Sequence, residues 1–359
     1  MNLYPASPDD ITPQWLNDNC QLGGLVSRVT STTIGEGVGM LGVLGRLSLE
    51  YSEGSGPASV IAKLASPYEP VLDLVEMFGF YEREINFYRH ATGDVTNIPR
   101  SHYADVSASG RGFALILEDL SHCRVPDQVT GCSATDATTV MVELAKLHAH
   151  HWHIDRNPTF AWLSKGNEGK YREGEAQYAM VYEPFLAVYG DRLSSHGRRV
   201  ADLCRTKTMQ MADTAIATRP LTLTHMDLRL DNVLFNDGAT AGISPVYFID
   251  WQLCVQGVGA LDVAYFIAWS MDDETRRANT QSLMHTYHRA LHDAGVTGYS
   301  YAEFEDDVRR SLLLVAMMAS FGAIAVPASN QRGLDLIEAL VMRTYLTVDD
   351  MRAYEMFPA

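Results

Sequence analysis

Residues 223–235 read LTHMDLRLDNVLF, and this stretch decides how the rest of the chain is interpreted. It contains His225, Asp227 two residues later, and Asn232 five residues after that aspartate. An apolar run follows and ends in a second carboxylate, Asp250. Carboxylate and amide oxygens suit Mg²⁺, and a further carboxylate can orient an attacking hydroxyl. The spacing therefore predicts a loop that carries out phosphoryl transfer.

The order of these residues resembles a known family. His225-x-Asp227-x-x-x-x-Asn232, followed by Ile249-Asp250-Trp251, is similar to the aminoglycoside phosphotransferase and choline-kinase-like branch of the protein-kinase-like fold. The resemblance implies an α+β fold with two lobes. The N-terminal lobe would be a small antiparallel sheet with one main helix, and the C-terminal lobe would be larger and mostly helical.

The resemblance also implies roles for the residues of the loop. Asp227 would be the catalytic residue, and His225 would be structural. Asn232 and Asp250 would hold Mg²⁺ against the phosphates of ATP. Asp262, at the start of a later helix, would brace the loop. The alternative is that Asp262 is only a helix N-terminal charge that the helix dipole stabilises.

Length and composition set the frame for this hypothesis. A chain of 359 residues can form two lobes, expected at 1–120 for nucleotide binding and 121–359 for catalysis and acceptor binding, with a helical insertion at about 155–220. The net charge of −16 argues against a nucleic-acid partner. Clustered acids favour an amine-bearing acceptor; the candidates are Asp272, Asp273, Glu274, Glu303, Glu305, Asp306 and Asp307.

The chain is expected in the cytoplasm. Its five cysteines are scattered and contain no C-x-x-C, which favours reduced thiols, and residues 1–16 do not have the pattern of a signal peptide. The apolar run at 312–326 is shorter than the ~20 residues of a membrane span and stops at Pro327, so a buried helix is expected rather than a membrane anchor. The oligomeric state is left open.

The N-terminal lobe offers parts for binding ATP. Gly35, Gly37 and Gly39 lie between two strand-like runs, where a glycine turn can approach phosphates closely or can simply close a hairpin. Lys63 interrupts an apolar strand, and a charged residue there is costly unless it is paired. The resemblance implies that Lys63 holds the α- and β-phosphates, whereas an edge-strand lysine facing water is the alternative.

Two further segments complete this lobe. Residues 70–89 predict one helix with an apolar stripe, and the resemblance implies that Glu84 on it pairs with Lys63, with Glu82 as the rival. A strand ending near Glu118 resembles the linker that bonds the adenine edge, roughly Glu118 to Leu120.

Other readings stay open. His148, His150, His151 and His153 have i, i+3 spacings of the kind that metal ligands use, but no H-E-x-x-H accompanies them. Trp251-Gln252 replaces the Phe-Gly of protein kinases, which points to a small-molecule acceptor. That acceptor could be an amino alcohol or aminoglycoside-like compound, a neutral sugar, a lipid-like alcohol or a steroid. A catalytically inactive binding module is the alternative from another class.

Overall fold

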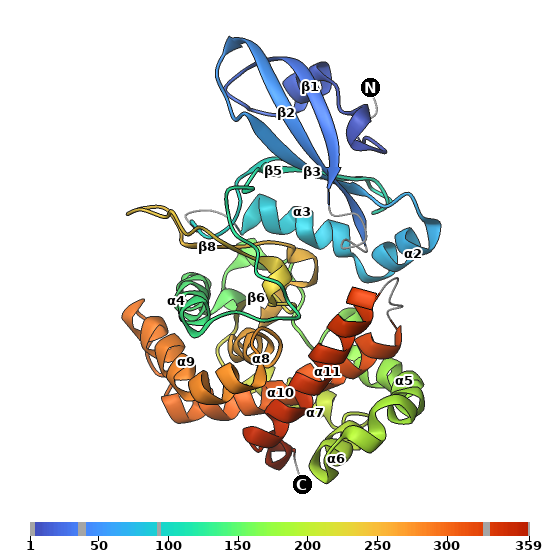
Figure 1. Ribbon diagram of the computed structural model, residues 1–359, viewed down its shortest axis with the longest axis vertical. Helices are drawn as coiled ribbons and strands as arrows, with labels where there is room; N and C mark the ends of the chain where they lie inside the picture. The colour runs from blue at the N-terminus through green and yellow to red at the C-terminus, as the bar shows by residue number, and fades with distance from the viewer. Residues whose placement is uncertain (1–3, 35–40, 92–94, 326–330, 358–359) are drawn as a thin grey trace. The chain divides into compact units, whose positions relative to one another are not determined.

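The computed structural model describes residues 4–34, 41–91, 95–325 and 331–357. These residues divide into two compact units. Unit 1 comprises residues 1–123 together with 247–253, and unit 2 comprises residues 124–246 and 254–359. Figure 1 shows the path of the chain through both units, coloured from the N-terminus to the C-terminus.

Unit 1 is built on a five-stranded antiparallel sheet with the strand order β1-β2-β3-β5-β4. Its elements are η1 (Pro8–Asp10), α1 (Pro13–Asn19), β1 (Gly24–Ile34), β2 (Gly42–Gly54), β3 (Ser59–Ala65), α2 (Glu69–Phe78), α3 (Phe80–His90), β4 (Ser101–Val106), β5 (Phe113–Glu118) and η7 (Trp251–Leu253). The strand β8 (Val246–Phe248) runs from unit 2 into unit 1.

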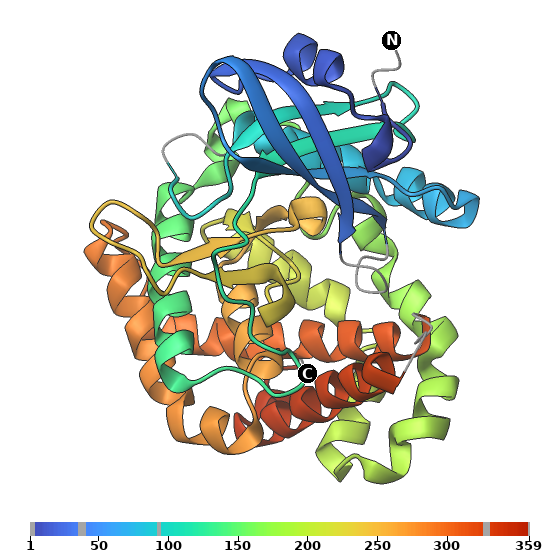
Figure 2. The same cartoon turned by 45° about the horizontal axis from the view of Figure 1, so that its top comes forward.

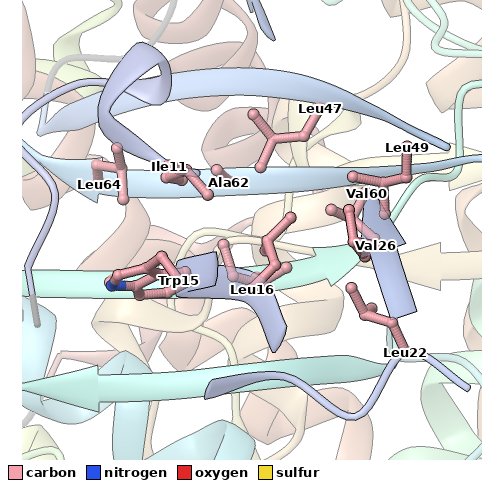
Figure 3. Close-up of a cluster of buried hydrophobic side chains, with 12 residues drawn as sticks. Ile11, Trp15, Leu16, Leu22, Val26, Leu47, Leu49, Val60, Ala62 and Leu64 are labelled. Atoms are coloured by element: carbon pink, nitrogen blue, oxygen red, sulfur yellow. The ribbon is translucent and has the colours of Figure 1, made fainter. Parts of the chain in front are cut away.

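The two faces of this sheet pack against different parts of unit 1. Along β3 the buried side chains alternate, and Val60, Ala62 and Leu64 all point to the same face. There they join Trp15 and Leu16 of α1 in a hydrophobic core (Figure 3). Lys63 therefore points to the opposite face, where it meets α3.

The helix predicted over residues 70–89 is two helices. Gly79 adopts φ +66°, which ends α2 and begins α3. This left-handed conformation costs little for glycine, and Gly79 is followed directly by a new helix that the apolar periodicity alone does not separate.

Unit 2 is mostly helical. Its larger elements are α4 (Ala134–His150), α5 (Gly174–Tyr189), α6 (Ser195–Leu203), α7 (Thr208–Thr218), β6 (Thr222–Thr224), β7 (Val233–Phe235), β9 (Val255–Gly257), α8 (Ala260–Trp269), α9 (Asp273–Asp293), α10 (Tyr301–Ala325) and α11 (Gln331–Asp350). Shorter 3₁₀ turns are η2 (Ile154–Arg156), η3 (Pro158–Phe160), η4 (Gly169–Glu173), η5 (Gly190–Arg192), η6 (Leu230–Asn232) and η8 (Ala353–Met356).

Helix α8 forms the centre of unit 2, since every one of its residues is buried. Helix α10 packs against α5, α8 and α11 (Figure 2). Among the described helices, α10 is long and apolar enough to cross a bilayer by length and composition, and half of its most apolar window is buried within the protein. The predicted α+β class, with a small antiparallel sheet and a larger helical part, is confirmed.

Candidate active site

The loop of residues 225–232 lies between β6 and β7 in unit 2 and is anchored by Asp262. The backbone N–H of His225 donates to Oδ2 of Asp262 at 2.6 Å, and that of Met226 donates to Oδ1 at 3.0 Å. Met226 has φ +68°, a conformation that strains any residue with a Cβ. Glycine would adopt this φ without strain. In this chain the two hydrogen bonds to Asp262 hold the backbone of Met226 in the strained conformation.

Asp227 and Asn232 meet within this loop. Nδ2 of Asn232 donates to the carbonyl oxygen of Asp227 at 2.9 Å and to its Oδ2 at 3.0 Å. Oδ1 of Asn232 makes no hydrogen bond to a described residue, so it is a suitable ligand for a hard cation. The Asp227 side chain is 22% exposed, whereas His225 is buried and its Nδ1 accepts from the backbone of Asp227 at 3.3 Å. The loop thus presents one carboxylate and one amide oxygen.

A buried histidine contacts the carboxylate of Asp262. His148, on α4, places Nε2 3.3 Å from Oδ2 of Asp262 and Nδ1 2.6 Å from the hydroxyl of Tyr287 on α9. A neutral imidazole protonated at Nε2 satisfies both contacts, because it donates to the aspartate and accepts from the tyrosine. Gly259 leaves room for this arrangement, since a Cβ there would lie 2.7 Å from Nδ1 of His148 and 2.8 Å from Oη of Tyr287.

The histidine-rich helix α4 therefore supports the loop through the contact of His148 with Asp262. Both ring nitrogens of His148 are engaged, and Nδ1 of His151 contacts the carbonyl of Leu147 at 3.1 Å. The residues that the structure describes contain no group of three or more His, Cys, Asp or Glu side chains that could hold a metal ion. The Mg²⁺ chemistry expected of Asn232 and Asp250 needs fewer protein ligands, because Mg²⁺ keeps waters and substrate phosphates.

Arg229 belongs to the loop although the motif did not indicate it. Its Nε lies 3.3 Å from Oδ1 of Asp227, and its Nη1 is hydrogen-bonded to Asp231. The charges of these two carboxylates raise the pKa of the guanidinium against the opposing effect of burial. Neither hydrophobic periodicity nor motif spacing predicts the contact of Arg229 with Asp227, because the contact depends on how the loop turns.

In unit 1, Lys63 lies between two carboxylates. Its Nζ is 2.8 Å from both oxygens of Glu84 and 2.8 Å from Oδ1 of Asp250. Burial opposes the charge of Lys63, but Asp250 and Glu84 outweigh it and raise the pKa of the ammonium. Burial raises the pKa of Glu84, an effect that the ammonium of Lys63 offsets in part. Glu84, and not the exposed Glu82, is therefore the partner of Lys63.

Helix α3 also holds the segment that carries Asp250. The Trp251 ring stacks on Phe87 with centroids 4.1 Å apart and planes 9° apart. Nη1 of Arg83 donates to the carbonyl oxygen of Gln252 at 2.8 Å. Asp250 itself has φ +68°, so these flanking contacts fix a strained residue.

The structure describes only some of the remaining residues that were predicted to bind ATP. Gly35, Gly37 and Gly39 lie outside the described residues. Glu118 ends β5, and its backbone N–H donates to the carbonyl of Arg100 at 2.8 Å. Leu120 is buried just beyond it.

Comparison with known proteins identifies a family that spans most of the chain. Residues 36–296, well over half of the chain, match the ecdysteroid kinase-like family. An uncharacterized kinase-like protein of Caenorhabditis elegans is 23% identical over 235 residues, which are 63% of this chain and 61% of that protein. The chain thus aligns with less than two thirds of that relative's length.

Solved structures share the fold at low sequence identity. A Ralstonia eutropha protein assigned to the aminoglycoside phosphotransferases has a TM-score of 0.58 and 16% identity, over 97% of this chain and 98% of that one. A variant of aminoglycoside 2′-phosphotransferase IIIa in complex with GDP has a TM-score of 0.57 and 14% identity, over 90% and 94%. The choline kinase of Cryptosporidium parvum has a TM-score of 0.52 and 11% identity, over 91% and 90%.

These likenesses confirm the predicted resemblance to small-molecule kinases of the protein-kinase-like fold. The match over residues 36–296 includes Lys63, Glu84, the loop with Asp227, and Asp262. The chain belongs to the ecdysteroid kinase-like family.

Proposed function

We propose that this protein transfers the γ-phosphoryl group of ATP to a hydroxyl of a small molecule. The observation that carries the proposal is the pairing of Asp227 with Asn232 on a loop whose backbone is tied to Asp262. Phosphoryl transfer needs positioning and charge neutralisation more than covalent help, and a fixed carboxylate beside an amide oxygen supplies the positioning.

Each residue of the site has a distinct role in this proposal. Asp227 accepts a hydrogen bond from the acceptor hydroxyl, directs it toward the phosphorus and takes up its proton. Lys63, kept charged by Glu84, binds the α- and β-phosphates, and Glu118 to Leu120 bind the adenine edge. Oδ1 of Asn232 and the carboxylate of Asp250 are the hard oxygen donors that would hold Mg²⁺, which offsets phosphate charge when bound.

The acidic residues of unit 2 give limited support to an amine-bearing acceptor, because most of them have partners within the protein. Asp272 caps α9. Asp307 contacts Arg219 at 2.7 Å and Arg310 at 3.0 Å. Four of the other five acids also have partners: Asp273 with Arg276, Glu303 with Ser300, Glu305 with Gln281 and Asp306 with Arg309. The fifth, Glu274, is exposed.

A neutral apolar alcohol is the second candidate acceptor, and a specific surface favours it. Arg332, the second residue of α11, lies 3.9 Å from Asp231, so the start of α11 is beside the catalytic loop. The end of α10 and the first turns of α11 carry apolar side chains that are partly or fully exposed; they are Met318, Phe321, Ile324, Leu334, Leu336, Ile337 and Leu340. The family name, ecdysteroid kinase-like, points in the same direction, toward a steroid alcohol.

A hydroxyl panel tests both the activity and the acceptor class. Purified protein would be incubated with ATP, Mg²⁺ and one of three acceptor sets: amino alcohols and aminoglycosides, sugars, and sterol or long-chain alcohols. Acceptor-dependent ADP release supports the kinase, and the set that gives the highest kcat/KM identifies the class. If no acceptor releases ADP although ATP shifts the melting temperature, the protein is an inactive nucleotide-binding module. If ATP also fails to shift it, the assignment of the ATP site is wrong.

The same proposal includes the setting in which the enzyme works. The five cysteines, all of them within the described residues, are thiols rather than disulfides, as expected of a protein in the reducing cytoplasm. ATP is abundant in that compartment, and no nucleic-acid or membrane partner is needed for the reaction.

A further inference from the structure

Arg229 is placed to act on the same phosphorus atom as Asp227. The two side chains are in contact, with Nε of Arg229 3.3 Å from Oδ1 and 3.4 Å from Oδ2 of Asp227. Both are only partly exposed, at 20% and 22% of the side-chain surface. A carboxylate that directs a hydroxyl at phosphorus must lie within a few ångströms of the oxygens on that phosphorus, so a guanidinium beside it can reach those oxygens.

A second aspartate fixes the orientation of the guanidinium. Nη1 of Arg229 is hydrogen-bonded to Asp231, whose side chain is 13% exposed. The backbone N–H of Asp231 donates to Oε1 of Gln128 at 3.2 Å, and the fully buried Gln128 donates in turn to the carbonyl of Trp269 at 2.7 Å. The residue that holds Arg229 is therefore itself attached to the end of the buried helix α8.

This arrangement leaves donors of the guanidinium unused. Nε faces Asp227 and Nη1 faces Asp231, while Nη2 makes no hydrogen bond to any residue that the structure describes. Arginine is a planar fork suited to two oxygens of one phosphate, and it remains charged at every pH of interest. Arg332, 3.9 Å from Asp231, supplies a second cation to that aspartate, so Asp231 does not depend on Arg229 alone.

We propose that Arg229 is a catalytic residue that donates hydrogen bonds from its free guanidinium edge to the transferred phosphoryl group. The proposal rests on the phosphotransferase function proposed above. As the acceptor oxygen–phosphorus bond forms, the bond from phosphorus to the bridging oxygen of ADP breaks, and the hydroxyl proton passes to Asp227. Arg229 keeps its proton throughout and neutralises charge on the non-bridging oxygens.

The alternative is that Arg229 only positions Asp227, and a transition-state mimic separates the two roles. Arg229→Gln, Arg229→Lys and a control, Arg124→Gln, would be compared. Arg124 is also held between two aspartates, at 2.8 Å from Asp136 and 2.9 Å from Asp237, and does not contact the loop aspartate Asp227. Turnover, melting temperature, and the affinities for MgADP and for MgADP with aluminium fluoride would be measured.

We expect Arg229→Gln to lower kcat by about 10²- to 10³-fold, a loss of the size seen when one preorganised donor is removed. Its affinity for MgADP should stay within about threefold of wild type, while the additional affinity for aluminium fluoride should fall by about 10-fold or more. Arg229→Lys keeps the charge and should recover part of both losses, and Arg124→Gln should resemble wild type.

The opposing outcomes are equally definite. An active wild type with Arg229→Gln turnover within about threefold, or with aluminium fluoride affinity unchanged, overturns the role of Arg229 and leaves the proposed function intact. A wild type that transfers phosphate to no acceptor overturns the proposed function, and the role of Arg229 with it. Melting temperatures close to that of wild type exclude unfolding as the cause of a loss, and Arg229→Lys provides a variant that keeps the positive charge.

Discussion

Nζ of Lys63 lies 2.8 Å from both carboxylate oxygens of Glu84, and Glu84 is 1% exposed. The ammonium of Lys63 compensates the charge of this buried carboxylate, and a hydrogen bond from the backbone of Trp251 adds to the effect. Since Nζ also contacts Asp250, two negative charges share one positive charge. The arrangement keeps Lys63 charged and holds it on the face of β3 opposite the hydrophobic core.

Glu84→Gln should impair the use of ATP much more than Glu82→Gln. The amide keeps the shape of Glu84 but removes the charge that fixes Lys63, so kcat/KM for ATP should fall about 10- to 100-fold through misplacement of the lysine. Glu82 is exposed two residues away on the same helix and is the matched control. Steady-state kinetics with varied ATP would measure the difference, and equal effects of the two substitutions would contradict the pairing as a functional contact.

Asp227→Asn should retain nucleotide binding and lose most phosphoryl transfer. The amide remains the size of the carboxylate and can still occupy its place beside Asn232, but it cannot take up the proton of the acceptor hydroxyl. We expect kcat to fall by about 10²-fold or more, with the Kd for ATP within about threefold of wild type. Calorimetric titration with ATP and a coupled ADP assay give the two numbers. Turnover close to wild type would show that the active site lies elsewhere.

Gly259→Ala should destabilise unit 2, whereas Gly322→Ala should not. A Cβ at position 259 would overlap Nδ1 of His148 and the hydroxyl of Tyr287, and such overpacking costs about 1–3 kcal/mol. A Cβ at position 322, within α10, has no heavy atom within 4 Å, and replacing a helical glycine stabilises by about 0.5–1 kcal/mol. Urea unfolding of both variants would test this, and equal free energies of unfolding would contradict the packing described around His148.

Asp272→Ala should lower stability at neutral pH but not in acid. Asp272 caps α9 by accepting from the backbone N–H groups of Glu274 and Thr275, each at 3.0 Å, and these bonds hold its pKa below the ordinary value. Loss of such a cap costs about 1 kcal/mol. Because the folded-state pKa is depressed, this contribution is complete above the unfolded pKa of about 3.9 and is lost as pH falls through the folded-state value.

Free energies of unfolding measured at pH 7 and in acid would follow this change. The gap between wild type and Asp272→Ala should be present at pH 7 and close in strong acid. Asp272→Asn is the control, because asparagine caps helices without titrating. A gap between wild type and Asp272→Ala that did not change with pH would show that the carboxylate charge is not what stabilises α9.

The sequence predicted the fold because its strongest signals are local. The short distances along the chain between His225, Asp227 and Asn232 restrict how the loop can be built, and the lysine within an apolar strand needs a partner. The five strands of unit 1 likewise follow from β-branched and apolar runs separated by turns. The α+β class and the resemblance to small-molecule kinases, now supported by the family match, both rested on such signals.

What the sequence could not predict depends on conformation and on distant contacts. The break at Gly79 lies within an apolar periodicity that continues across it, so only a positive φ reveals two helices. The contact of Arg229 with Asp227 results from the turn of the loop. Asp307 looks like a candidate amine ligand in the sequence because one of its partners, Arg219, lies far along the chain.

The stack of Trp251 on Phe87 has a consequence for the order in which the protein is made. Unit 1 takes its last segment, residues 247–253, from a part of the chain that follows the whole 225–232 loop and several helices of unit 2. A nascent chain that has been synthesised only as far as Cys123 therefore has its sheet but lacks the ring that covers Phe87 and the carboxylate beside Lys63. The first domain to emerge from the ribosome cannot finish folding until much of the second has followed it, which makes the two units of this chain interdependent during biosynthesis.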